Sequence, residues 1–262
     1  RLGTTTSISN RSSSNSSNIS GTLRRVRLNP VADALWNSAC RPIAASGNLA
    51  PPNCEVVRLT IDDDLTSAEG LARALAAVSD PNFQVLLFGA LHCTGGSHWQ
   101  NINWRRGKDT QRKIRGHWEV FETLFSSLEK VAAACSLNGR NIAIDWPRAC
   151  AYWSRPAVQS FIRLHALVDF DFDGCMFGLC SMVDSMLGRP IKKPWRIDSN
   201  MPEFANLRLS CAHQTSEHAP CAGADTKTSE GYTDALATSI HACFALHEEP
   251  SGPGGKGYRR AR

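Results

Sequence analysis

The sequence predicts an α/β fold in which a Rossmann-like, mostly parallel sheet is flanked by helices. Two observations support this prediction. Short apolar runs bounded by Gly, Pro or polar residues alternate with longer segments whose apolar residues recur at helical spacing. Those longer segments can supply the helical crossovers that join parallel strands. The chain has 262 residues, which is enough for one domain with a full hydrophobic core.

The alternating pattern assigns six elements in order. The expected elements are a strand at 55–61, a helix at 67–78, a strand at 83–91, a helix at 112–139, a strand at 141–147 and a helix at 155–167. Ser67 is a residue type that caps a helix N-terminus, and Gly139 is typical of a helix end. Pro147 stops the third strand. From residue 170 onward the pattern is irregular, with β character.

The two ends of the chain differ from its centre in composition. Residues 1–22 are rich in Ser and Asn, and residues 248–262 are rich in Gly and basic residues. Both segments are too poor in apolar groups to bury a core. We therefore expect a disordered low-complexity linker at 1–22, one domain at 23–247 and a flexible basic tail at 248–262.

The cysteines and the apolar runs bear on the compartment. Ten cysteines are scattered through apolar segments and no secretory leader opens the chain, which favours reduced thiols in an intracellular protein, nuclear or cytoplasmic. No apolar run approaches the ~20 residues that a membrane helix needs. We expect no membrane partner.

Reactive side chains follow three of the expected strands. Asp62, Asp63 and Asp64 follow the first strand, Cys93 follows the second, and Asp145 lies at the end of the third. Ligands of open α/β sheets bind at the carboxyl ends of the strands, so these side chains are expected near one site. Cys93 is either a core thiol or a nucleophile. The acids at the neighbouring strand ends support the second interpretation.

This order of motifs resembles the cytosine-5 DNA methyltransferases, and most of all their divergent members in phage genomes and in polyproteins of protist mobile elements. "LHCTGGS" stands at the place of the family's Pro-Cys motif, and "IDWP" stands at the place of its Glu-Asn-Val motif. "DGCMFGL", "GRPIKKPWRIDSN" and "CAHQTSEHAPC" follow in order, so the resemblance covers residues 55–243.

The resemblance implies a class I methyltransferase-like fold, S-adenosylmethionine as cofactor and nucleic acid, DNA rather than RNA, as partner. It implies that Cys93 is the nucleophile that adds to the base and that Asp145 is the acid beside the ring. Asp62 and Asp64 would face the adenosine end of the cofactor.

The sequence departs from the family in three places. His92 replaces the proline before the cysteine, and an imidazolium there would lower the pKa of the thiol. Asp145 is one methylene shorter than the family's Glu. The opening strand and its glycine loop have no counterpart, since the nearest small-residue stretch is 45–49. We therefore predict that the N-terminal strand is missing and that the chain binds nucleic acid without methylating it.

Basic residues suggest where nucleic acid would bind. The net charge is +5, and part of the excess lies at 104–115 and 192–196. Solvated surface would also account for such runs. The predicted phosphate contacts are Arg105, Arg106, Lys108, Arg112, Lys192, Lys193 and Arg196.

A second candidate site is a group of cysteines and histidines near the C-terminus. Cys211, His213, His218 and Cys221 are ligand types suited to tetrahedral zinc, although an ordinary loop explains them equally well.

The sequence leaves two functions open. One is a divergent cytosine-5 DNA methyltransferase-like domain of a mobile-element polyprotein, active or degenerate. The other is a non-catalytic nucleic-acid-binding module on the same scaffold.

Overall fold

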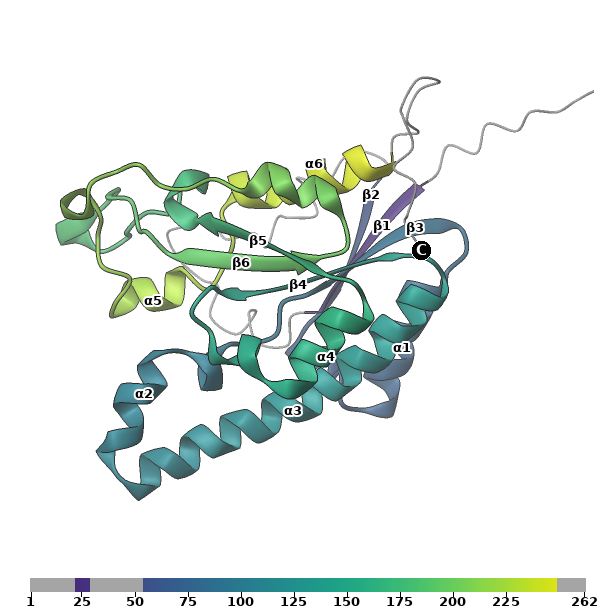
Figure 1. The fold of residues 1–262 in the computed structure, drawn as a ribbon, viewed down its shortest axis with the longest axis horizontal. Coiled ribbons are helices and arrows are strands. Elements are labelled where there is room, and N and C mark those ends of the chain that lie inside the picture. The colour runs from purple at the N-terminus through teal and green to yellow at the C-terminus, as the bar shows by residue number, and fades with distance from the viewer. Residues whose placement is uncertain (1–21, 29–53, 249–262) are drawn as a thin grey trace, which may run out of the picture.

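The computed structural model describes residues 22–28 and 54–248, which form one mixed sheet with helices on both of its faces (Figure 1). The α/β class is therefore confirmed. Short 3-10 turns join many of the elements. The strands and helices are β1 (Thr22–Leu28), β2 (Cys54–Leu59), α1 (Ala68–Ser79), β3 (Phe83–Gly89), α2 (Trp99–Asn103), α3 (Lys108–Leu137), β4 (Asn141–Pro147), α4 (Pro156–Leu164), β5 (Val168–Asp173), β6 (Pro194–Ser199), α5 (Ala224–Thr228) and α6 (Asp234–Glu248).

The sheet is mixed, which corrects the expectation of a mostly parallel one. Its strand order is β2-β1-β3-β4-β6-β5. The pairs β1 with β2, β1 with β3 and β3 with β4 are parallel, whereas β6 runs antiparallel to both β4 and β5. The connection from β5 to β6 contains only 3-10 turns and no α-helix. An antiparallel pair needs no helical crossover, so this connection suits the reversed direction of β6.

The strand β1 corrects a second expectation, that the N-terminal strand is missing. It lies between β2 and β3 and pairs in parallel with both. Its sequence, TLRRVRL, contains three arginines, whereas internal parallel strands are normally apolar runs. The pattern of apolar residues in the sequence therefore did not indicate this strand. Except for Thr22 and Glu248, the segments 1–22 and 248–262 lie outside the described residues, as does the stretch 45–49.

The helices and strands predicted between residues 55 and 167 are confirmed, with shifted ends. Ser67 caps α1 by accepting a hydrogen bond from the Gly70 backbone N–H at 3.0 Å. The helix α3 begins at Lys108, earlier than predicted, and its apolar stripe is buried. None of the helices in the described ranges combines the length and apolar character needed to cross a membrane.

The two faces of the sheet form two cores. In β3, Val85 and Leu87 pack in the core that contains α1, α3 and α4, and Leu86 and Phe88 pack in the core that contains α6. The alternation follows from the period of two residues in a strand. Because β3 and β4 are parallel neighbours covered on both faces, their carboxyl ends meet at one edge of the sheet, where side chains are free to surround a cavity.

Candidate functional site

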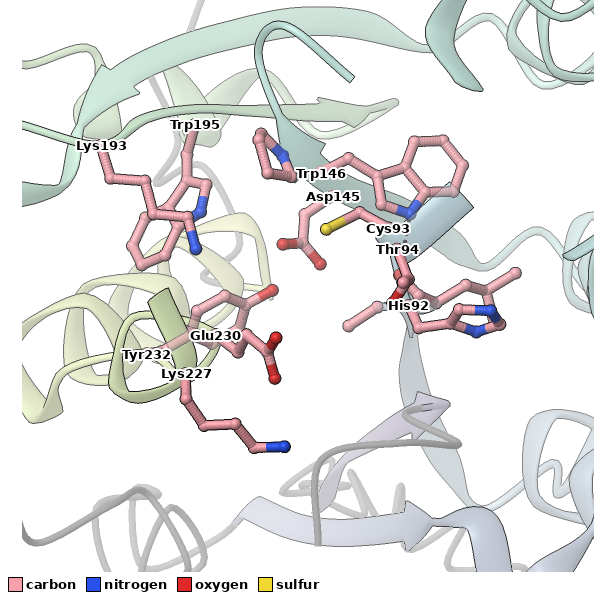
Figure 2. Close-up of a pocket in the computed structure, with 13 residues that line it drawn as sticks. His92, Cys93, Thr94, Asp145, Trp146, Lys193, Trp195, Lys227, Glu230 and Tyr232 are labelled. Carbon is pink, nitrogen blue, oxygen red and sulfur yellow. Dashed lines mark hydrogen bonds between the residues drawn. The ribbon is translucent and has the colours of Figure 1, made fainter. Parts of the chain in front are cut away.

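Cys93 and Asp145 line one pocket at the carboxyl ends of β3 and β4. Gly89, the last residue of β3, pairs with Ile144, the neighbour of Asp145. Figure 2 shows the thiol and the carboxylate pointing into the same cavity, which has a volume of about 180 Å³. The prediction that these two side chains come from adjacent strand ends is confirmed.

Residues 92–97, here called the thiol loop, are held firmly against the helical layer. The Gly96 N–H donates to the Cys93 carbonyl at 2.9 Å, and the Trp118 indole donates to the Gly95 carbonyl at 2.8 Å. A Cβ atom at residue 96 would lie only 2.5 Å from the Cys150 sulfur. Glycine is therefore needed for the loop to approach its neighbours, and this packing fixes the position of the thiol.

A buried hydrogen bond couples the two strand ends. The indole N–H of Trp146 donates to the backbone carbonyl of Leu91 at 2.8 Å. Leu91 precedes Cys93 by two residues, and Trp146 directly follows Asp145. The bulky residue at this place in "IDWP" therefore ties the strand that carries the carboxylate to the segment that carries the thiol.

The opposite wall of the pocket comes from the start of β6, with the residue before it, and from the segment before α6. It contributes Lys193, Trp195, Glu230 and Tyr232 (Figure 2). The Lys193 ammonium donates to the Ser229 carbonyl at 2.5 Å and lies 5.3 Å from the centre of the Trp195 ring. Trp195 and Tyr232 meet edge to face, with ring centres 5.6 Å apart. The cavity therefore combines aromatic surface with a thiol, carboxylates and an ammonium group.

The electrostatics of the pocket keep the thiol neutral at rest. Burial raises the pKa of Cys93, and Lys193 opposes this shift while Glu230 and Asp145 add to it. Burial, with a contribution from His117, lowers the pKa of His92, so its imidazole is neutral at neutral pH. An imidazolium at His92 is therefore not available at neutral pH to lower the pKa of the thiol, because partial burial disfavours the charged form of the ring.

The three acids after β2 have different surroundings. Asp63 accepts a hydrogen bond from the Thr60 N–H at 2.6 Å and pairs with Arg73. Asp64 has a φ of 36° and accepts from the Thr66 N–H at 3.1 Å. These two carboxylates thus stabilise the turn that leads into α1. The Asp62 side chain is exposed, and the described residues that line the thiol pocket include none of the three acids.

Four of the predicted phosphate contacts lie together on an extension of the fold, here called the arm and defined as residues 98–115. Figure 1 shows α2 and the first part of α3 extending away from the sheet, beside the segment that follows β3. The arm follows the thiol loop directly along the chain. Its exposed basic residues include Arg105, Arg106, Lys108 and Arg112, and Arg112 pairs with Asp109 at 3.0 Å.

The other three predicted phosphate contacts are separate from the arm. Lys192 is exposed and its ammonium lies 3.7 Å from the Asp173 carboxylate, and Lys193 lines the pocket. Arg196 donates two hydrogen bonds, of 2.5 and 2.8 Å, to the fully buried Asp198, and its guanidinium stacks on Trp153. These contacts engage Nε and one terminal nitrogen of the guanidinium, which makes Arg196 a weaker candidate for a phosphate contact than the exposed basic residues of the arm.

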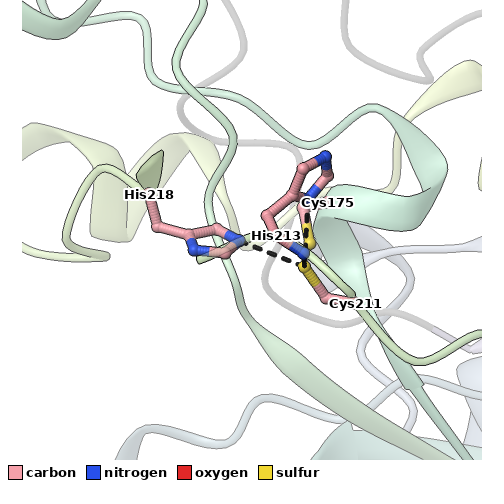
Figure 3. Close-up of side chains that lie close together, drawn as sticks. All are labelled: Cys175, Cys211, His213 and His218. Atoms are coloured by element: carbon pink, nitrogen blue, oxygen red, sulfur yellow. Dashed lines mark hydrogen bonds between the residues drawn. The ribbon is translucent and has the colours of Figure 1, made fainter. Parts of the chain in front are cut away.

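The Cys/His group near the C-terminus is assembled differently from the prediction. Cys211, His213 and His218 converge, but their fourth companion is Cys175, which follows β5 (Figure 3). The Cys221 sulfur lies 3.2 Å from the Ser229 hydroxyl instead. Cys221 is therefore wrong as a member of the group, because the chain between His218 and Cys221 turns back toward the pocket wall.

Several site residues gave no usable signal in the sequence. Glu230 and Tyr232 stand in an unremarkable polar stretch, and Cys175 is too remote from Cys211 for any spacing rule to join them. Only the folded chain brings them to their sites. Comparisons of this chain with protein-family models, with curated proteins and with solved structures find no match.

Proposed function

We propose that the chain is a divergent cytosine-5 DNA methyltransferase-like domain, of the type carried by mobile-element polyproteins, on a class I methyltransferase-like scaffold. The observation that carries the proposal is the presence of Cys93 and Asp145 in one pocket, at the ends of neighbouring parallel strands. In this proposal the pocket receives a pyrimidine base turned out of its stack. Trp195 and Tyr232 supply aromatic surface against which such a ring packs.

The chemistry of the pocket is a covalent addition. The thiolate is the nucleophile, so the Cys93 thiol must lose its proton for the sulfur to attack. The raised pKa of Cys93 means that a base must assist this loss at neutral pH. The Asp145 carboxylate in the same pocket can accept that proton and pass it to N3 of the ring as the bond from sulfur to C6 forms. The π pair of the C5–C6 bond moves to the C4–C5 bond, and the π pair of the C4–N3 bond takes up the proton, so the ring becomes an enamine whose C5 is nucleophilic. Atoms and charge balance, since the thiol proton ends on the ring.

Among the described residues, Asp62 is the candidate contact for S-adenosylmethionine. The exposed Asp62 carboxylate follows β2, beside the end of β1, where it suits the hydroxyl groups of a ribose. The segment that follows β1, residues 29–53, lies outside the described residues. The cofactor, when bound, supplies the methyl group, and the addition of Cys93 to the ring does not depend on it.

Two observations favour the second candidate, a nucleic-acid-binding module without catalysis. The raised pKa of Cys93 leaves little thiolate at neutral pH, and Asp63 and Asp64 are engaged in a local turn. In both candidates the basic side chains of the arm would contact phosphates. Neutralising each such contact should reduce the slope of log affinity against log salt by ~0.9.

A base that reacts with thiols without a methyl donor tests the proposal. The full chain is incubated with a DNA duplex containing 2(1H)-pyrimidinone, whose C6 is more electrophilic than that of cytosine. We expect a covalent adduct in wild type that Cys93→Ser abolishes and that Cys180→Ser, outside the pocket, retains. DNA binding without an adduct would favour the non-catalytic module. Absence of both binding and adduct would overturn both candidates.

A further inference from the structure

We propose that Cys175, Cys211, His213 and His218 form a structural zinc site that is separate from the thiol pocket. Their four ligand atoms all lie within 4.8 Å of one another. Figure 3 shows the side chains converging from two segments that are distant in the sequence, one after β5 and one in the loop at 208–219. This inference does not depend on the proposed function.

The distances between the ligand atoms suit a tetrahedral ion. The Cys211 sulfur lies 3.0 Å from Nδ1 of His213 and 3.3 Å from Nε2 of His218. Bonds of about 2.3 Å to sulfur and about 2.0 Å to nitrogen give tetrahedral edges of roughly 3.3 to 3.8 Å. The group therefore needs only small side-chain adjustments to surround a zinc ion.

Neighbouring groups orient the ligands for this role. Nδ1 of His218 lies 3.0 Å from the Gln214 carbonyl, and donating there leaves Nε2 as the nitrogen that faces Cys211. The His213 backbone N–H donates to the Cys211 sulfur at 3.3 Å, and the Cys211 N–H donates to the Asp173 carboxylate at 2.9 Å. Partners of this kind fix the orientation of a metal-bound histidine and stabilise a thiolate.

The ligand set selects the metal and its role. Two thiolates and two imidazoles neutralise a divalent ion and favour zinc over the oxygen-binding ions Mg²⁺ and Ca²⁺. Four protein ligands fill a tetrahedral shell and leave no position for substrate, so the site is structural. A bound zinc ion would hold the loop at 208–219 against the end of β5.

A bound ion would also affect the thiol pocket, because a backbone hydrogen bond connects the Cys/His group to the pocket wall. The Gly174 N–H, next to Cys175, donates to the carbonyl of Lys193 at 2.9 Å. Lys193 lines the pocket and opposes the rise in the pKa of Cys93. We therefore expect zinc binding to fix one wall of the pocket as well as the loop.

Metal analysis of the full chain, purified with a reductant and without added chelator, tests the site. We expect about one zinc per chain in wild type and at least a tenfold loss in Cys175→Ser and in Cys211→Ser. Cys221→Ser and Cys180→Ser, which change cysteines outside the group, should retain the metal. Equal zinc loss in Cys221→Ser and Cys175→Ser would overturn the assignment of ligands.

Two further measurements keep the proposal falsifiable if the serine variants fail to fold. Cobalt added to wild-type protein should give the intense visible absorption of a tetrahedral ion and a thiolate-to-metal band, whereas weak octahedral absorption would contradict the site. Free thiols are then counted under non-reducing conditions. A Cys175–Cys211 disulfide in protein that takes up neither metal would show that the two thiols form a redox pair instead.

Discussion

The thiol pocket and the Cys/His group use the same residue type in opposite surroundings. Cys93 faces carboxylates and an ammonium group across a cavity, whereas Cys211 lies in contact with a second cysteine and two histidines. The first arrangement leaves a sulfur free to attack an incoming ring, and the second arrangement can enclose an ion. Neighbouring groups, rather than the cysteine itself, therefore determine which chemistry a thiol can perform.

The two regions also differ in how the fold assembles them. The pocket draws Cys93 and Asp145 from neighbouring strand ends, so sheet pairing sets their relative position. The Cys/His group draws its members from loops that hydrogen bonds attach to β5, such as the bond from the Asp173 N–H to the Leu209 carbonyl at 3.0 Å. A metal would stabilise the loops, whereas the pocket is already held by the core.

Cys93→Ser should have the strongest effect, because it removes the nucleophile of the pocket and leaves the Cys/His group intact. Cys93→Ser should abolish adduct formation with the pyrimidinone duplex while zinc content and the melting temperature stay near wild type. Cys211→Ser should lose zinc and lower the Tm by at least about 4 °C, because losing even ~2 kcal/mol shifts a domain of this size by that much. Differential scanning fluorimetry with metal analysis measures both. Zinc loss in Cys93→Ser would show that the two regions are not separate.

Asp145→Asn tests whether the carboxylate moves a proton. We expect adduct formation to slow by about 10²- to 10⁴-fold, the usual effect of losing a general acid and base. Asp145 also contributes to the raised pKa of Cys93, so alkylation by iodoacetamide should not slow in the same variant. Rates of both reactions are followed by mass spectrometry. Equal slowing of the two reactions would show that the substitution merely disturbs the thiol.

Gly96→Ala tests the packing of the thiol loop. The added Cβ would lie 2.5 Å from the Cys150 sulfur and 2.9 Å from the Tyr152 ring. Overpacking of this kind costs about 1–3 kcal/mol, so the free energy of unfolding in urea should fall by that amount. Gly116→Ala is the matched control, because its Cβ meets nothing within 4 Å and it lies inside α3. That change should stabilise the protein by ~1 kcal/mol.

The smallest expected effects concern the pH dependence of Cys93. Because its pKa is raised, the thiolate fraction and hence the alkylation rate should still be rising at about pH 9, above the pKa of about 8.5 of a free thiol. Lys193→Met should slow alkylation at pH 8, since Lys193 lowers this pKa, and Glu230→Gln should accelerate it. A rate that reaches its plateau below pH 8 in wild type would contradict the neutral resting thiol.

Much of the site was predictable because two rules link sequence to position. Apolar periodicity located the strands that end near Cys93 and Asp145, and the carboxyl ends of parallel strands meet at one edge. The Cys/His group was predictable only in part, because spacing along the chain found Cys211, His213 and His218 and could not find Cys175. A remote fourth ligand has no characteristic spacing.

Some predictions failed where interactions between distant segments outweigh local pattern. The arginines of β1 hid a strand that is paired on both sides, and nothing in the sequence indicated the contact between Arg196 and the buried Asp198. A charged imidazole at His92 would lower the pKa of Cys93, but burial lowers the pKa of His92 and disfavours that charge. Pairing, burial and ionisation depend on what surrounds a residue, and the sequence does not state those surroundings.

Sequence alone predicts the α/β class, the order of elements from 55 to 167, the position of Cys93 after one strand and that of Asp145 near the end of the next. These follow from local periodicity and from the connection rules of sheets. Tertiary contacts place β1 inside the sheet, reverse the direction of β6, bring Cys175 to the Cys/His group and raise the pKa of Cys93. Each of these depends on hydrogen bonds, contacts or desolvation between segments that lie far apart in the chain, and local pattern contains no record of them.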